Sequence, residues 1–245
     1  ALARERALFD SCRAGPEGRA LIHVFFAERA AAKAPEAPRG TRQPDIATCG
    51  VVGAGTMGRG IAIAFAAAGL DTILFENDAQ RRAPAREAVD SHFAGQAQRG
   101  RMTTEEATRA AARVTLAASV EDLAKADLIV EAAFESMAVK REVFAALDRV
   151  AKPEAILATN TSTLDISEIA GATRRPERVL GLHFFSPAQV MRLLEIVRAP
   201  ATDAGVLAAA SGFARRIGKT GVVVGNAPGF VANRMIFEYQ RQGEF

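Results

Sequence analysis

The sequence predicts an α/β fold in which helices cover both faces of a doubly wound, mostly parallel β-sheet. Short apolar runs alternate along the chain with longer segments of helical periodicity. A glycine-rich turn joins the first of these runs to the helix behind it. Of the 245 residues, 49% are hydrophobic, so the chain can bury one large core.

The N-terminal part predicts a helix followed by a linker. Apolar residues recur at helical spacing between positions 21 and 26, which favours a helix over 1–34. The residues that would end it are Pro35, Pro38, Gly40 and Pro44. We therefore expect a linker helix ahead of the α/β domain.

Strands and helices then follow one another to the end of the chain. The apolar runs predict strands at 46–52, 72–75, 128–131, 155–158, 179–182, 191–197 and 221–224. The segments between them predict helices at 56–68, 79–99, 104–111, 137–150 and 203–217, and a last helix begins at 230. Gly69 suits the end of the first of these helices.

Composition excludes several classes of protein. The net charge is only +3 and the arginines are scattered, so no nucleic-acid partner is predicted. The longest apolar run, 61–70, is too short to cross a bilayer, so no integral membrane contact is expected. Cys12 and Cys49 form no CxxC motif, and the three histidines show no metal-ligand spacing. We predict no metal site.

The turn "GAGTMG" at 53–58 follows a strand and opens a helix, which is the context that a dinucleotide-binding GxGxxG motif needs. The first glycine permits the tight turn, the second lets a pyrophosphate approach the backbone, and the third lets the helix pack on the strand. The N–H groups of the helix start then face the phosphates. The predicted cofactor-binding residues here are Gly53, Gly55, Thr56, Met57 and Gly58.

Glu76 ends the second strand, 18 residues after Gly58. A carboxylate at this place binds the hydroxyls of an adenosine ribose and repels a 2′-phosphate, so NAD is favoured over NADP. Arg81 and Arg82 lie close by in the sequence and weaken that preference. The whole region predicts a Rossmann-type domain that binds NAD.

His183 and Glu195 lie in two apolar runs on either side of Pro187. If these runs form a hairpin centred on Gln189, the two side chains face each other at a separation of about 5 Å between Cβ atoms. The carboxylate would then hold the imidazole so that its other nitrogen can accept a proton. A purely structural pair in the core is the alternative. Beside a dinucleotide site, we favour an acid/base for hydride transfer.

Five blocks of the sequence, in this order, resemble the 3-hydroxyacyl-CoA dehydrogenases of fatty-acid β-oxidation. They are "GVVGAGTMGRGIA", "VEAAFESMAVKREVF", "NTSTLDISEIA", "GLHFFSPAQVMRLLEIV" and "NAPGFVANRM", and they cover the chain from 46 to the C-terminus. "ALIHVFFAERAAAKAP" resembles the linker helix of multifunctional enzymes that also carry an enoyl-CoA hydratase/isomerase domain. The stretch "HFFSPAQVMRLLE" resembles the peroxisomal type of these multifunctional enzymes and its bacterial relatives.

The resemblance implies the oxidation of (3S)-3-hydroxyacyl-CoA to 3-ketoacyl-CoA with NAD. It makes His183 the catalytic base and Glu195 its orienting partner. Ser162 and Asn233 would hydrogen-bond the substrate oxygen near the reacting carbon. Each of the last two residues has an alternative, since Ser162 could cap a turn and Asn233 could pack at a helix start.

The resemblance also implies contacts to the cofactor and the substrate's CoA. Glu76 would bind the adenosine ribose, and Glu135 and Lys140 would contact the nicotinamide side. Ser186 stands near the nicotinamide, where some members carry asparagine. Lys140 could instead be a solvated helix residue. Ser91 is the candidate for a CoA contact.

Three segments are expected on this basis. Residues 1–44 would be the linker after an absent hydratase/isomerase domain, 45–227 the NAD-binding domain, and 228–245 the start of a truncated helical domain that could mediate oligomerisation. The expected compartment is the cytoplasm for a bacterial protein and the peroxisome for a eukaryotic one. The alternatives are a non-catalytic NAD-binding module and a β-hydroxyacid dehydrogenase of the 6-phosphogluconate type, which would need a catalytic lysine.

Overall fold

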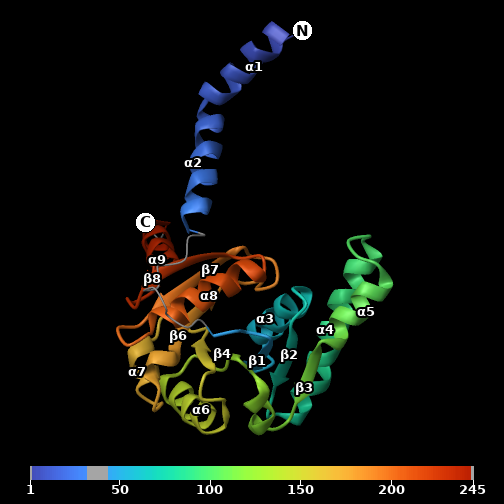
Figure 1. Ribbon diagram of the computed structural model, residues 1–245, viewed down its shortest axis with the longest axis vertical. Helices are drawn as coiled ribbons and strands as arrows, with labels where there is room; N and C mark the ends of the chain where they lie inside the picture. The colour runs from blue at the N-terminus through green and yellow to red at the C-terminus, as the bar shows by residue number, and fades with distance from the viewer. Residues whose placement is uncertain (1, 32–43, 244–245) are drawn as a thin grey trace.

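The computed structural model describes residues 2–31 and 44–243. Its centre is one eight-stranded sheet with the order β3-β2-β1-β4-β5-β6-β7-β8 (Figure 1). Strands β3 to β6 of this order are parallel, β7 is antiparallel to β6, and β8 is parallel to β7. The prediction of an α/β fold with a mostly parallel sheet is confirmed.

The strands are short and mostly buried. They are β1 (Thr48–Val52), β2 (Asp71–Phe75), β3 (Val114–Ala117), β4 (Leu128–Glu131), β5 (Ile156–Thr159), β6 (Val179–Phe184), β7 (Leu193–Arg198) and β8 (Thr220–Gly225). Every residue of β4, β5 and β6 is buried, as expected for parallel strands that are covered on both faces.

The helices of the α/β body cover the two faces of the sheet. They are α3 (Thr56–Ala67), α4 (Ala79–Gln98), α5 (Thr104–Ala112), α6 (Met137–Val150), α7 (Ile166–Ala170), α8 (Ala204–Arg216) and α9 (Ala232–Gly243), with short 3₁₀ turns at Val120–Lys125 and Pro176–Arg178. Residues of α3, α4, α5 and α8 belong to one buried apolar cluster. Residues of α6 and α7 belong to a second cluster on the opposite face (Figure 1).

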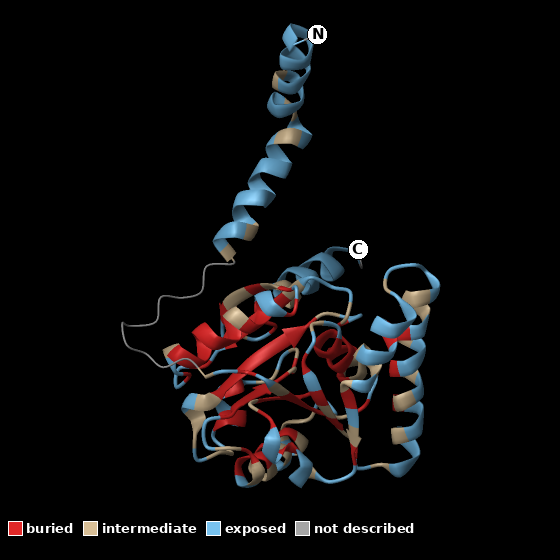
Figure 2. Ribbon diagram, turned by 45° about the vertical axis from the view of Figure 1, so that its right-hand side comes forward, coloured by how far each residue is buried: buried red, intermediate tan, exposed pale blue. Residues whose placement is uncertain are grey.

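The two N-terminal helices, α1 (Leu2–Ala14) and α2 (Pro16–Ala31), extend away from the α/β body and bury no residue (Figure 2). The prediction of one continuous helix was wrong at Gly15, because Pro16 has no N–H and starts a new helix instead of extending the old one. Glu28 of α2 forms an ion pair of 3.1 Å with Arg192, which precedes β7. The predicted linker residues Pro35, Pro38 and Gly40 lie outside the described residues.

Two elements of the body escaped prediction. In β3 the exposed Thr115 interrupts the apolar run that revealed the equally short β4 and β5, and α7 is too short to show a helical period. The strand expected from 191 begins at Leu193, because Met191 and Arg192 still belong to the loop after β6. None of the helices within the described ranges is long and apolar enough to cross a membrane.

Candidate active site

The predicted site residues other than Ser91 lie toward the edge of the sheet where four parallel strands end. Val52 of β1 pairs with Glu131 of β4, and Glu131 pairs with Thr159 of β5. Thr159 in turn pairs with Gly181 of β6, just before His183. The strand order reverses direction between β1 and β4, which is where open α/β sheets bind ligands.

Glycine suits each of three positions in the 53–58 loop for a different steric reason. Gly53 adopts a φ of 93°, which a side chain would strain. A Cβ atom on Gly58 would lie 1.7 Å from the carbonyl oxygen of Gly53, so α3 can start this close to β1 only with glycine there. A Cβ atom on Gly55 would meet nothing within 4 Å, so the backbone at this point is open to a ligand. The geometry at Gly53 and Gly58 agrees with the tight turn and the close packing expected there, and the approach of a pyrophosphate to Gly55 stays a prediction.

A cavity of about 530 Å³ lies against this loop, and we call it the glycine-loop cavity. Gly53, Gly55, Thr56, Met57 and Glu76 all line it, as predicted for cofactor-binding residues. The size suits part of a dinucleotide, and the open glycine beside a carboxylate fits a phosphate and a ribose.

Glu76 is more constrained than the sequence indicated. Its side chain is buried, and its two carboxylate oxygens accept the backbone N–H groups of Ala54 and Asp78 at 3.0 Å and 3.1 Å. The carboxylate therefore ties the end of β2 to the glycine loop. Arg81 also lines the cavity and is ion-paired with Asp78 at 3.3 Å.

His183 and Glu195 form the predicted pair. They are directly opposed in the antiparallel ladder of β6 and β7, and His183 Nδ1 lies 2.7 Å from Glu195 Oε2. Both side chains are buried. The other carboxylate oxygen accepts the N–H groups of Val231 and Ala232 at 3.0 Å and 2.9 Å, at the start of α9.

These contacts fix the charge state of Glu195. Burial by itself raises the pKa of a carboxyl group, but the hydrogen bonds from His183, Ala232 and Val231 outweigh it, and the pKa of Glu195 lies below its ordinary value. Glu195 is thus a carboxylate at neutral pH. It can hold the imidazole in one orientation and stabilise the imidazolium that forms when the ring accepts a proton.

The imidazole of His183 stands between two aromatic rings. Its centroid is 4.5 Å from that of Phe185 and 5.6 Å from that of Phe230. Within the described part of the chain, Nδ1 is the ring nitrogen that is hydrogen-bonded, and Nε2 has no protein partner. Nε2 is therefore free to exchange a proton with a bound molecule.

Ser162 and Asn233 come together from distant parts of the sequence. Asn233 Nδ2, in the first turn of α9, donates to the carbonyl oxygen of Ser162 at 3.2 Å. The hydroxyl of Ser162 makes no hydrogen bond to any described residue, so it is free for a ligand. α9 thereby joins both the His183–Glu195 pair and the loop after β5.

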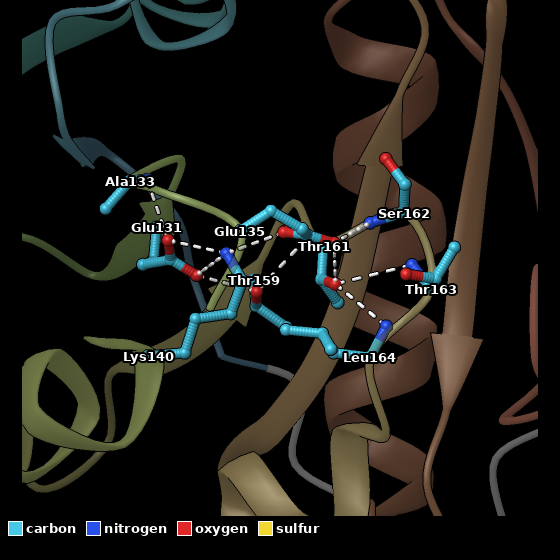
Figure 3. Close-up of polar contacts among 9 residues, drawn as sticks. All are labelled: Glu131, Ala133, Glu135, Lys140, Thr159, Thr161, Ser162, Thr163 and Leu164. Atoms are coloured by element: carbon cyan, nitrogen blue, oxygen red, sulfur yellow. Dashed lines mark hydrogen bonds and ion pairs between the residues drawn. The ribbon is translucent and has the colours of Figure 1, made fainter. Parts of the chain in front are cut away.

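Glu135 and Lys140 belong to a network of polar contacts in which Lys140 is buried and the side chain of Glu135 is 42% exposed (Figure 3). Lys140 Nζ lies 2.9 Å and 3.0 Å from the two carboxylate oxygens of Glu131 and 3.1 Å from Glu135 Oε2. Glu135 Oε1 accepts the Thr161 hydroxyl at 2.5 Å and the Ser162 N–H at 2.9 Å. These hydrogen bonds, with the ion pair to Lys140, outweigh burial and hold the pKa of Glu135 below its ordinary value. Glu135 thus positions Ser162.

The expectation that Lys140 could be a solvated helix residue was wrong. Its side chain is 1% exposed, because two carboxylates neutralise the ammonium group inside the protein. Sequence reasoning also missed Glu131, which is fully buried at the end of β4 and accepts the Thr159 hydroxyl and the Ala133 N–H at 2.7 Å each. The signal was a carboxylate ending the otherwise apolar run "LIVE".

A model of the family described as 3-hydroxyacyl-CoA dehydrogenase, NAD binding domain, matches residues 48–227. The match covers more than half of the chain. The chain belongs to this family.

Relatives of this dehydrogenase domain include long and short proteins. The "Peroxisomal bifunctional enzyme" of Cavia porcellus is 42% identical over 247 residues, which is 99% of this chain and 34% of that protein. The structure of 3-hydroxybutyryl-CoA dehydrogenase from Escherichia coli K12 has a TM-score of 0.79 and 37% identity, covering 81% of this chain and 42% of the other. The dehydrogenase part of multifunctional enzyme 1 from C. elegans has a TM-score of 0.74 and 32% identity, covering 89% and 52%. The chain therefore spans about a third of the length of the bifunctional relatives it matches.

Two further predicted residues of the dehydrogenase domain are exposed. Ser186 lies in the loop between β6 and β7, directly after Phe185, and so near the His183 ring. Ser91 lies on α4, a helix that runs beside the β3 edge of the sheet (Figure 1), and it is not among the residues that line the glycine-loop cavity. Neither serine lines the glycine-loop cavity, and the roles of both stay predictions.

Proposed function

We propose that this chain is the dehydrogenase part of an enzyme that oxidises (3S)-3-hydroxyacyl-CoA to 3-ketoacyl-CoA with NAD in fatty-acid β-oxidation. The observation that carries the proposal is the 2.7 Å contact between His183 and Glu195 at the same sheet edge as the glycine loop. Membership of the family supports NAD as the cofactor. The names of the bifunctional and 3-hydroxybutyryl-CoA relatives support the acyl-CoA substrate class.

NAD, when bound, accepts the hydride that leaves the carbon bearing the hydroxyl group. The residues of the chain handle the proton. His183 Nε2 takes the hydroxyl proton, and Glu195, held as a carboxylate, stabilises the resulting imidazolium. The Ser162 hydroxyl and the Asn233 amide hydrogen-bond the substrate oxygen as it becomes a carbonyl.

The cofactor would lie across the glycine loop with its adenosine ribose at Glu76. Gly55, Thr56 and Met57 offer an open backbone and the N-terminus of α3 to the pyrophosphate. Glu135 and Ser186 would stand on the nicotinamide side. Lys140, whose ammonium group is held by Glu131 and Glu135, would act there by positioning Glu135.

The segments on either side of this domain belong to the proposal as well. Residues 1–44 would link it to an enoyl-CoA hydratase/isomerase part, 45–227 would bind NAD, and 228–245 would begin a helical domain that closes over the substrate and could make an oligomer. Within the NAD-binding domain, Ser91 on α4 would contact the CoA part of the substrate. The enzyme would work in the cytoplasm of a bacterium or the peroxisome of a eukaryote, since relatives of the second kind carry peroxisomal names.

The test is the oxidation of NADH with acetoacetyl-CoA, the reverse reaction. It is measured with this chain and with one extended past Phe245 by the helical region that the resemblance predicts, each with and without His183→Ala. General base catalysis contributes about 10²- to 10⁴-fold, so we expect a loss of that size with unchanged NADH affinity. His92→Ala, a histidine of α4, is the matched control.

The alternative is a non-catalytic NAD-binding module in which the pair is structural. It predicts that both chains bind NADH and that neither shows turnover that depends on His183. A β-hydroxyacid dehydrogenase of the 6-phosphogluconate type is disfavoured by the family match and offers no role for the His183–Glu195 pair.

A further inference from the structure

Lys219 is a buried cation that the proposed reaction does not use. It lies between α8 and β8, its side chain is 8% exposed, and no described carboxylate is paired with it. Its ammonium group donates instead to two backbone carbonyl oxygens, those of Ala188 and Met191, at 2.7 Å each. Burial lowers the pKa of Lys219, which shows that its environment disfavours the charge.

Both carbonyl groups belong to the loop of residues 185–192 between β6 and β7. A single donor that bridges carbonyls of Ala188 and Met191 fixes the separation of two points on this loop. Two more hydrogen bonds, from the N–H groups of Val190 and Met191 to the carbonyl of Pro187, make the segment between them a compact turn. Lys219 therefore braces the turn from the β8 side.

The same turn also packs on α3, the helix that the glycine loop opens. A Cβ atom on Gly60 of α3 would lie 2.8 Å from Gln189 Oε1 and 3.1 Å from the Cβ of Ala188. Close packing on α3 and the two hydrogen bonds from Lys219 therefore both hold the turn in place. At its start the loop carries Phe185, against the ring of His183, and then Ser186.

We propose that Lys219 is a positioning residue that holds the 185–192 loop, so that Phe185 and Ser186 stand at the nicotinamide side of the cofactor site. The inference rests on the proposed function, which sets the nicotinamide beside His183. Burying an ammonium group that has only carbonyl partners costs desolvation free energy. An apolar side chain of similar length would fill the same space without that cost. The loop that it holds gives a reason for a lysine at this position.

The experiment compares two ligands that differ in the nicotinamide. NADH and ADP-ribose share the adenosine, the pyrophosphate and the second ribose, but ADP-ribose has no ring to meet the loop. In Lys219→Met, two charge-assisted hydrogen bonds are lost and the side-chain volume stays, so we expect NADH to bind roughly tenfold more weakly. The affinity for ADP-ribose should change by less than about twofold, which is within the noise of distant substitutions.

Lys152→Met is the matched control. Lys152 is also a partly buried lysine, paired with Asp127 at 2.6 Å, but it precedes β5 at the opposite edge of the sheet. Its loss should lower the thermal midpoint and leave both ligand affinities unchanged. Lys219→Arg, which keeps the charge and the donors, should recover part of the NADH affinity that Lys219→Met loses.

The outcomes separate the inference from the proposed function. Equal weakening of NADH and ADP-ribose in Lys219→Met, or no change in either, overturns the positioning role. A wild-type chain that binds neither ligand overturns the proposed function. If Lys219→Met does not fold, Gly60→Ala pushes the same turn from the α3 side. A loss of affinity confined to NADH then supports the inference, and an equal loss of both ligands rejects it.

Discussion

The turn after β1 and the strand pair β6–β7 lie along one edge of the sheet but achieve their geometry by different means. At the turn, the shape of the glycine-loop cavity comes from backbone that no side chain obstructs, at Gly53, Gly55 and Gly58. At the strand pair, the geometry is set by two buried polar side chains, His183 and Glu195, that contact each other. The Glu131–Lys140–Glu135 network between the two regions is built in the second way.

The difference predicts how each region fails. A backbone site loses its ligand when a side chain appears, and the fold suffers only where that side chain collides. A site of buried charges loses stability together with function, because removing one partner leaves the other charged and without water.

The largest expected effect is on stability, from the network of buried charges. Lys140→Met leaves the buried carboxylate of Glu131 without its cation, and breaking a buried pair in this way costs about 3–5 kcal/mol. Glu135 also loses its ion pair, but its exposed carboxylate is hydrated and adds little to the cost. Chemical denaturation measures the free energy of unfolding, with the exposed Lys125→Met as the control. A loss within about 0.5 kcal/mol, the range of surface substitutions, would mean that the network is not needed for the fold.

The contrast also decides what the sequence could predict. The glycine loop and Glu76 were found from a local motif, because backbone geometry is encoded by the residues at the turn itself. The His183–Glu195 contact was predicted too, because a hairpin centred on Gln189 sets its register and the structure has that register.

Contacts between distant segments could not be predicted. Nothing in the sequence near Glu195 indicates that it accepts the N–H groups of Val231 and Ala232, since this depends on how α9 packs against β7. Glu131 and Lys140 are nine positions apart. Their pairing needs a turn of defined geometry between β4 and α6, so Lys140 read equally well as a solvated helix residue.

The second largest expected effect is the dependence of stability on pH that Glu195 causes. Because the pKa of Glu195 is lowered in the folded chain, its carboxylate stabilises the fold above its ordinary pKa, and this stability is lost as the pH falls through the lowered value. Glu195→Gln should cost about 1.5–3 kcal/mol at neutral pH, the range for hydrogen bonds to charged groups. The difference between wild type and variant should shrink on acidification.

Denaturation at a series of pH values from neutral to acidic measures that difference, with the exposed Glu142→Gln of α6 as the control. A difference that stays constant across the series would show that the charge of Glu195 contributes nothing and that only its shape matters. The same variant should lose turnover more than NADH affinity, since Glu195 acts through His183.

In the glycine loop, Gly58→Ala and Gly55→Ala should have different effects, because only the first new methyl group collides with the protein. Gly58→Ala places a Cβ atom 1.7 Å from the Gly53 carbonyl oxygen, so β1 and α3 must separate. Overpacking of this kind costs about 1–3 kcal/mol, and NADH binding should be lost with it. Unchanged stability would mean that the turn adapts, and the backbone account of this region would then be wrong.

Gly55→Ala is the smallest change and the sharpest one. Its Cβ atom meets no protein atom within 4 Å, so the free energy of unfolding should stay as it is. The same methyl group would stand where the pyrophosphate approaches, and NADH affinity should fall roughly tenfold, equivalent to about 1.4 kcal/mol. Gly225→Ala, equally open but at the end of β8, should leave the affinity unchanged. Stability and binding would then separate completely at Gly55, as a backbone site requires, whereas at Glu195 stability and turnover should fall together.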